Sequence, residues 1–256
     1  MWGCIRVATR FGFRAAGCRF LAPLFVALLA IPGALADQEV PRIEFFTGFE
    51  ASDNYTSAYV GGGYAFGKGF HQESLRLRAV GSLGRYHYDG SLENGGVWRP
   101  TRFDGDASFV AALAGYEFHF GRVISKIFAG VEAVDQRISP RDPNNSVQGS
   151  EMGFRIVAEN WVDLSPTWHL SADAAYGTDF QEYWSLARIG YRLKPRLSVG
   201  VEGGALGNQE YDAGRAGAFA RFYLLDTEMT LASGFTGNYL EDDPSGYLSL
   251  GVRRAF

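Results

Sequence analysis

Long apolar runs are almost absent from this sequence of 256 residues. Beyond Ala36, no stretch approaches the roughly twenty continuous apolar residues that a membrane-spanning helix needs. If residues 37–256 enter a membrane, they must do so as a closed sheet. Only helices and barrels satisfy all of their own backbone hydrogen-bonding groups in lipid.

Cysteine is equally scarce. The chain has two, Cys4 and Cys18, and both precede residue 37. The rest of the chain therefore has no disulfide framework, no thiolate nucleophile and no cysteine metal site. It also lacks a phosphate-binding loop and a dinucleotide fingerprint. We expect no cofactor and no bound metal.

The residues for catalysis are also missing. A lipid hydrolase on the wall of a barrel needs a serine, a histidine and an acidic or amide partner close together. No histidine has a serine at a suggestive spacing; the four are His71, His87, His119 and His169. The sequence therefore predicts that the protein is not an enzyme.

Basic charge is in short supply. The chain has 24 Lys and Arg against 28 Asp and Glu. Four of the arginines and none of the acidic residues lie within the first 36 residues, so the rest of the chain is more acidic still. A nucleic-acid partner would require a basic face, and this balance argues against one.

The first 36 residues differ in kind from the remainder. Their four arginines precede an apolar run, Phe20–Ile31, and Ala34-Leu35-Ala36 supplies small residues before Asp37. This is the three-part plan of a secretory signal, and the apolar run is too short for a membrane-spanning helix. We expect residues 1–36 to be a cleavable signal peptide and residues 37–256 to form the mature domain.

In residues 37–256, short segments alternate between apolar and polar side chains, as transmembrane strands do. One face of the segment 154–164 suits lipid and the other suits water: Phe154, Ile156, Ala158, Asn160, Val162 and Leu164 stand opposite Arg155, Val157, Glu159, Trp161 and Asp163. Such segments begin near Arg42, Thr56, Ser74, Ala107, Val123, Glu151, Trp168, Tyr183, Leu197, Arg215, Glu228 and Tyr247. The pattern predicts an all-β fold, a transmembrane antiparallel up-and-down β-barrel of about 12 strands.

The connections alternate in length, as those of outer-membrane barrels do. The short ones are Gly121-Arg122, Ser165-Pro166-Thr167, Lys194-Pro195-Arg196 and Asp226-Thr227. The longer ones include Asp89–Asp104, Ser139–Ser150, Gly207–Gly214 and Gly237–Ser245. We interpret their acidic and amide side chains, such as Asp142 and Asn145, as solvated.

A secreted, water-soluble β-sandwich would also alternate, but its outward face would be polar. Here the polar faces are too charged and too rich in glycine to fill a dry core. The aromatic content of 15% also fits the girdles of a membrane barrel. We therefore expect a protein of the Gram-negative outer membrane, surrounded by lipid.

The chain ends on an aromatic residue that closes an alternating strand. Phe256 follows Leu248, Leu250 and Val252 at a spacing of two. Such an ending resembles the signal that the barrel assembly machinery recognises, which makes that machinery an expected partner. Arg254 departs from the pattern, and it must lie near the interface because arginine in mid-membrane costs ~2–4 kcal/mol.

Charged residues of both signs fall on the faces predicted to line the interior. The candidates are Arg76, Arg78, Glu117, Glu132, Arg155, Glu159, Arg188, Arg192, Glu202 and Arg221, and the same faces carry Glu44, Glu50, Asp163, Asp173, Arg215, Glu228 and Arg253. The arginines either form a track for an anionic or hydroxyl-rich solute or are neutralised by carboxylates on neighbouring strands. We favour neutralisation, because the carboxylates are as numerous as the arginines.

The first strands resemble those of a known family, the BcsS cellulose-biosynthesis proteins of alphaproteobacteria. The resemblance rests on Phe46-Thr47-Gly48-Phe49-Glu50-Ala51-Ser52, Ala58-Tyr59-Val60-Gly61-Gly62, Leu75-Arg76-Leu77-Arg78-Ala79, Gly84-Arg85-Tyr86-His87-Tyr88-Asp89 and Gly115-Tyr116-Glu117. It implies an outer-membrane accessory protein of cellulose or exopolysaccharide production, and it implies no catalytic residues.

Two functions stay open. The first is a conduit or scaffold for polysaccharide export, with cellulose synthase components or the polysaccharide as partners and Trp98 and Tyr239 as residues that stack on sugar rings. The second is a small monomeric channel for oligosaccharides or other small solutes, suggested by the interior arginines.

Overall fold

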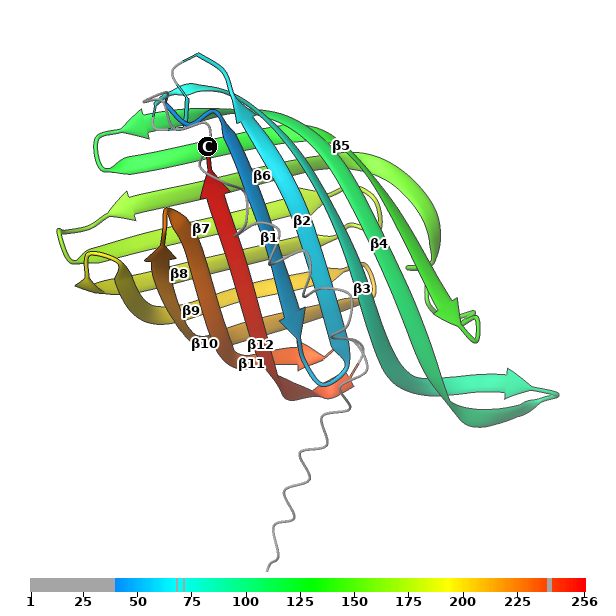
Figure 1. Cartoon of the computed structure of the whole chain (residues 1–256). Coiled ribbons are helices and arrows are strands. Elements are labelled where there is room, and N and C mark those ends of the chain that lie inside the picture. The colour runs from blue at the N-terminus through cyan, green and yellow to red at the C-terminus, as the bar shows by residue number, and fades with distance from the viewer. Residues whose placement is uncertain (1–39, 68, 71, 239–240) are drawn as a thin grey trace, which may run out of the picture. The chain divides into compact units, whose positions relative to one another are not determined.

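Twelve strands make up the part of the chain that the computed structural model describes, residues 40–67, 69–70, 72–238 and 241–256 (Figure 1). The predicted signal peptide, residues 1–36, lies outside the described residues. No helix long and apolar enough to cross a membrane occurs among the residues described.

Each strand pairs antiparallel with the next, and β1 pairs with β12, so that the sheet closes into a barrel. The strands are β1 (Ile43–Ala51), β2 (Tyr55–Ala65), β3 (Ser74–Asn94), β4 (Val97–Phe120), β5 (Val123–Ser139), β6 (Gly149–Asp163), β7 (Trp168–Gly177), β8 (Tyr183–Lys194), β9 (Leu197–Asn208), β10 (Tyr211–Leu224), β11 (Thr227–Asn238) and β12 (Glu241–Ala255). The predicted all-β, up-and-down barrel of twelve strands is confirmed.

The two faces of the strands differ as predicted. On β6 the outward side chains of Met152, Phe154 and Ile156 are 83%, 69% and 57% exposed, whereas Arg155 and Val157 between them are buried. A water-soluble sheet protein would bury the first set and expose the second. The outer surface is therefore matched to hydrocarbon and the interior to polar groups.

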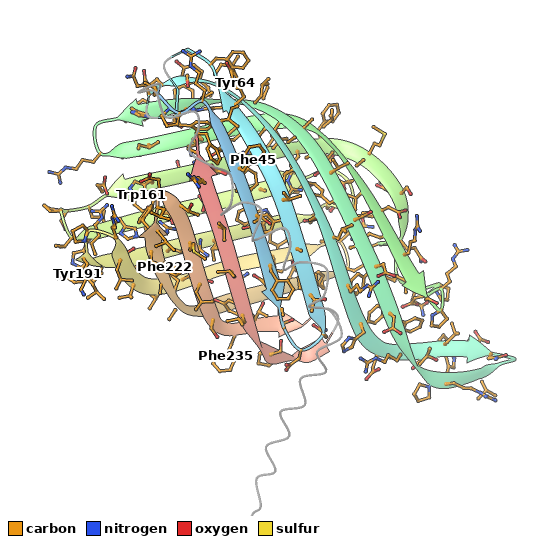
Figure 2. The ribbon with its side chains drawn as sticks, viewed as in Figure 1. Phe45, Tyr64, Trp161, Tyr191, Phe222 and Phe235 are labelled. Carbon is orange, nitrogen blue, oxygen red and sulfur yellow. The ribbon has the colours of Figure 1, made fainter. Side chains whose placement is uncertain are left out.

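Aromatic side chains mark both ends of this apolar outer surface. Figure 2 shows Phe45 and Tyr64 near the end of the barrel where the chain terminates, and Phe235 near the opposite end. All three are partly or largely exposed. Such a distribution is typical of the aromatic girdles that lie at the two lipid interfaces.

We call the two rims the terminal end and the loop end. The terminal end carries Phe256 and the connections at 66–73, 121–122, 164–167, 195–196 and 225–226; the loop end carries those at 52–54, 95–96, 140–148, 178–182 and 209–210. Most connections at the terminal end are tight, as predicted, but the one at 66–73 is longer.

Three of the connections expected to be long loops are mostly strand. In the expected loop Gly237–Ser245, β11 runs to Asn238 and β12 begins at Glu241, before the predicted Tyr247. β3 and β4 continue past the predicted strand ends to the two-residue turn Gly95-Gly96, and β9 and β10 likewise continue to the turn at 209–210. Gly95 and Gly96 have positive φ angles, 63° and 80°, which a tight hairpin turn of this kind requires. For this reason β4 and β10 begin before the predicted Ala107 and Arg215.

The last residue helps to close the barrel. The Phe256 amide donates to the Ile43 carbonyl at 2.7 Å, and the Phe256 carbonyl accepts from the Arg42 amide at 2.6 Å. Its ring lies edge-on to Phe45, and the Arg254 guanidinium lies 4.8 Å from the centre of the Phe256 ring. Arg254 is thus held at the terminal rim, where arginine is tolerated.

We predict that arginine on the outer face destabilises the barrel according to its depth. Ile156 lies in the middle of β6, and Leu224 is the last residue of β10; both are more than half exposed. Ile156→Arg should cost ~2–4 kcal/mol and Leu224→Arg ~0–1 kcal/mol, because arginine near an interface reaches water. Reversible urea unfolding in lipid vesicles measures the difference, and equal costs would contradict the assignment of this face to lipid.

Candidate functional site

Ion pairs fill much of the barrel interior, and each of the ten candidates, from Arg76 to Arg221, belongs to one. The pairs are Arg76–Glu117, Arg78–Glu159, Arg155–Glu132, Arg188–Glu202, Arg192–Asp163 and Arg221–Glu228. These pairs do not lie at one point. They belong to separate networks at different heights along the barrel.

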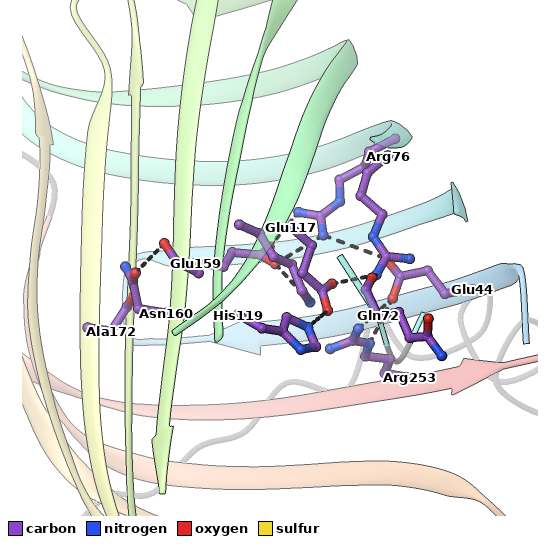
Figure 3. Close-up of polar contacts among 12 residues, drawn as sticks. Glu44, Gln72, Arg76, Glu117, His119, Glu159, Asn160, Ala172 and Arg253 are labelled. Carbon is purple, nitrogen blue, oxygen red and sulfur yellow. Dashed lines mark hydrogen bonds and ion pairs between the residues drawn. The ribbon is translucent and has the colours of Figure 1, made fainter. Parts of the chain in front are cut away.

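The first network begins on β12 and β1 and crosses to β5 and β6. Arg253 Nη2 lies 2.6 Å from Glu44 Oε2, and the second oxygen of Glu44 lies 3.6 Å from Arg78 Nη2. Arg78 also donates twice to Glu159, once over 3.1 Å, and Lys126 Nζ lies 3.6 Å from the same carboxylate. Figure 3 shows Glu44 beside Arg253, and Glu159 with them in the interior.

Aromatic rings hold the central arginine of this network. The Arg78 guanidinium lies 4.1 Å from the centre of the Phe128 ring and 5.4 Å from that of Phe46. A cation over a ring face gains further electrostatic stabilisation, most of all where water is scarce. Arg78 is therefore fixed by two carboxylates and two rings.

The second network joins β1 to β8, β9, β10 and β12. Arg215 Nη1 lies 2.9 Å from Glu50 Oε2 and its Nη2 lies 3.2 Å from Glu202 Oε1. Glu202 also accepts from Arg188 Nε at 2.7 Å and from the Tyr247 hydroxyl at 2.5 Å. Three donors thus compensate one buried carboxylate, as a charge out of water requires.

Together the networks span the interior. Glu44 on β1 and Glu159 on β6 share Arg78, although β1 and β6 lie on nearly opposite walls of the twelve-stranded ring. Paired charges of both signs cancel, so the arginines offer no continuous positive track. Among the residues described, no three His, Cys, Asp or Glu side chains come together as a metal site.

Not all of the interior is shut off from water. Tyr59 on β2 belongs to the inward face, since its ring lies against Gly48 and near Gly251, yet 40% of its surface is exposed. The Arg253 side chain is 43% exposed. Water therefore reaches the interior beside β1, β2 and β12.

The connection between β5 and β6, residues 140–148, lies over the mouth at the loop end. Tyr88 on β3 donates from its hydroxyl to Asp142 at 2.8 Å and accepts from the Asn145 amide at 3.1 Å. The backbone amide of Ser146 donates to Glu210 at 2.8 Å, on the turn between β9 and β10. Because β3 and β9 lie on opposite walls, the segment bridges the opening.

This segment corrects a sequence interpretation. Asp142 and Asn145 were expected to be solvated, but both are at least nine-tenths buried, as is Val147 beside them. A run of Pro, Asp and Asn does not reveal that a loop folds inward. Lys126 and Tyr247 also take part in the networks, and their positions on the inward faces of β5 and β12 are the sequence signal that could have pointed to them.

Comparison with known proteins identifies the relatives of this fold. The family model described as cellulose biosynthesis protein BcsS matches residues 44–256. An outer-membrane channel from Pseudomonas putida F1 is similar with a TM-score of 0.51, at 12% identity over 88% of this chain and 99% of that chain. The translocator domain of the autotransporter NalP from Neisseria meningitidis has a TM-score of 0.50, at 10% identity over 92% of this chain and 96% of that chain. No curated protein matches in sequence. Because the sequence identities are only 10% and 12%, these structural similarities support the outer-membrane barrel fold and no statement about function.

We predict that Glu202 is a strong determinant of stability. Glu202→Gln leaves Arg188 and Arg215 without their shared carboxylate in a buried place, which should cost about 3–5 kcal/mol of the free energy of unfolding. The matched control is Asp106→Asn, which breaks the exposed pair with Arg85 and should cost under about 1 kcal/mol. Both are measured by urea unfolding, and similar costs would show that the interior pairs are well solvated.

Proposed function

We propose a role that starts from the family: the chain belongs to the cellulose biosynthesis protein BcsS family, and it serves as an outer-membrane scaffold of cellulose or exopolysaccharide production. Its partners are then components of the cellulose synthase complex or the polysaccharide itself. Neither the family description nor the barrel fold points to an enzyme.

The bridged interior is the observation that favours a scaffold over an open conduit. A polysaccharide chain passing through would have to separate Arg78 from Glu44 and Glu159 and displace residues 140–148 from the mouth. Each separated pair would leave buried charges without partners, at a cost of several kcal/mol. A role at the surface of the barrel requires no such rearrangement.

The route to the outer membrane is part of the proposal. Residues 1–36 direct secretion and are removed, and residues 37–256 assemble as the barrel with the help of the barrel assembly machinery. The ending Leu248, Leu250, Val252 and Phe256 supplies the assembly signal. The outward exposure of Leu248 and the contacts of Phe256 with β1 support this role.

A narrow channel for small solutes is the second candidate. The solvent-exposed faces of Tyr59 and Arg253 inside the barrel favour it, because they line the part of the interior that water reaches. Such a channel would admit water and small ions more readily than a polysaccharide.

We predict that deleting the gene lowers cell-surface cellulose and that the wild-type gene restores it. The scaffold role requires this, since the protein would hold the export or assembly machinery in place. The measurement is dye binding to intact cells, with total cellulose as the control. Unchanged surface cellulose would reject the proposed role.

Conductance separates the two candidates. Planar-bilayer recordings of the refolded protein should show little current, and replacing residues 141–147 by a shorter glycine-serine linker should increase it, since these residues bridge the mouth. A wild-type protein with steady open-channel current would favour the solute channel.

A further inference from the structure

The β3–β4 hairpin extends beyond the rest of the barrel wall. Pairing of β3 with β2 ends at Tyr86, and pairing of β4 with β5 ends at Asp104. Residues 87–103 therefore form a two-stranded ribbon whose outer edges pair with no described strand; we call it the free ribbon. Figure 1 shows its tip standing clear of the other strands at the loop end, whereas Tyr88 and Phe103 at its base are buried.

The direction of its backbone groups follows from two observations. The His87 amide donates at 2.9 Å to the Asn54 carbonyl, so at position 87 the β3 backbone points away from β4. In an antiparallel strand, the N–H and C=O groups of successive residues point to alternate sides. The backbone groups of Asp89, Ser91 and Glu93 must therefore point away from β4, as those of His87 do. The two-residue turn after Asn94 requires the same alternation, because Asn94 must point toward its partner Val97 on β4.

The two edges of the free ribbon are not equivalent. On β4 the residue opposite Ser91 is Pro100, which lacks an N–H and so cannot donate to an added strand. Proline at an edge is one of the devices by which proteins prevent unwanted pairing. The β3 edge has no proline, and its three outward-pointing residues are exposed.

The charges along the β3 edge determine which kind of strand can pair with it. The charged side chains of the β3 edge, Asp89 and Glu93, are both acidic, whereas the arginines of the ribbon, Arg99 and Arg102, lie on β4. A second copy of this chain, pairing antiparallel about Ser91, would place Asp89 opposite Glu93 twice, and like charges directly opposite are destabilising. The fitting occupant is an extended, basic peptide segment.

We propose that the β3 edge of the free ribbon, Asp89–Glu93, binds an extended basic segment of a partner protein by β-strand addition. Main-chain hydrogen bonds supply affinity in this mode, and alternate side chains supply specificity. The partner should carry lysine or arginine opposite Asp89 and Glu93, with small or polar residues between them.

The test uses the refolded barrel in detergent and a short capped peptide of alternating threonine and lysine, followed by fluorescence anisotropy. The wild-type protein should bind this peptide and should not bind the same peptide with glutamate in place of lysine. Ser91→Pro removes one outward N–H without breaking a bond to β4, and it should weaken binding about tenfold. Ser91→Ala keeps the N–H and should bind as the wild type does.

Amide exchange measured by NMR locates the contact. The peptide should slow exchange at Asp89, Ser91 and Glu93 and leave Gly90 and Leu92, which are already bonded to β4, unchanged. Retained protection of Gly90 and Leu92 in Ser91→Pro shows that the ribbon is still folded. Equal binding by the Pro and Ala variants, equal binding of both peptides, or no binding of the lysine peptide overturns the proposal.

Discussion

The structure depends on one constraint: charges inside a closed sheet must find partners inside it. A barrel wall has no free edge, so the inward side chains of neighbouring and opposite strands meet only one another and the water trapped among them. Glu44, Glu202 and Arg78 are each at least nine-tenths buried and each bonded to more than one opposite charge or polar donor. Loss of one partner would leave the others unpaired in a medium of low polarity.

The need to pair interior charges also fixes the position and register of each strand in the barrel. The networks tie β1 to β6 and β1 to β10, which are far apart along the chain, and so add links across the interior to the hydrogen bonds within the wall. A slip of one residue in any of these strands would turn its charges toward lipid and its apolar residues inward. The ion pairs thereby oppose alternative registers as well as alternative folds.

Much of the fold could be predicted from the sequence, because lipid and water impose a period of two on every strand. Strand number and the faces of β6 follow from that period, and closure follows because a sheet in lipid can leave no backbone hydrogen-bonding group unpaired. The length of β3 and β4 did not, since Gly and Asp near position 90 suggest a loop whereas Gly95-Gly96 makes a tight hairpin. The partners of individual charges could not be predicted either. Glu44 and Arg78 meet across Gly63 of β2, which has no side chain to separate them, and this depends on the register of three strands. Residues 140–148 fold inward because of contacts with distant strands.

The central claim is that paired charges cross the barrel and keep water out of much of its interior, although not out of the part beside β1, β2 and β12. Residues 37–256 contain no cysteine, so single thiols can be placed at will. Ser171 faces inward on β7 and is 5% exposed, whereas Ser91 lies on the exposed ribbon. The direct measurement is the rate at which a charged, water-soluble thiol reagent modifies Ser171→Cys and Ser91→Cys in the reconstituted protein. The account predicts rapid modification at position 91 and almost none at position 171; equal rates would contradict it.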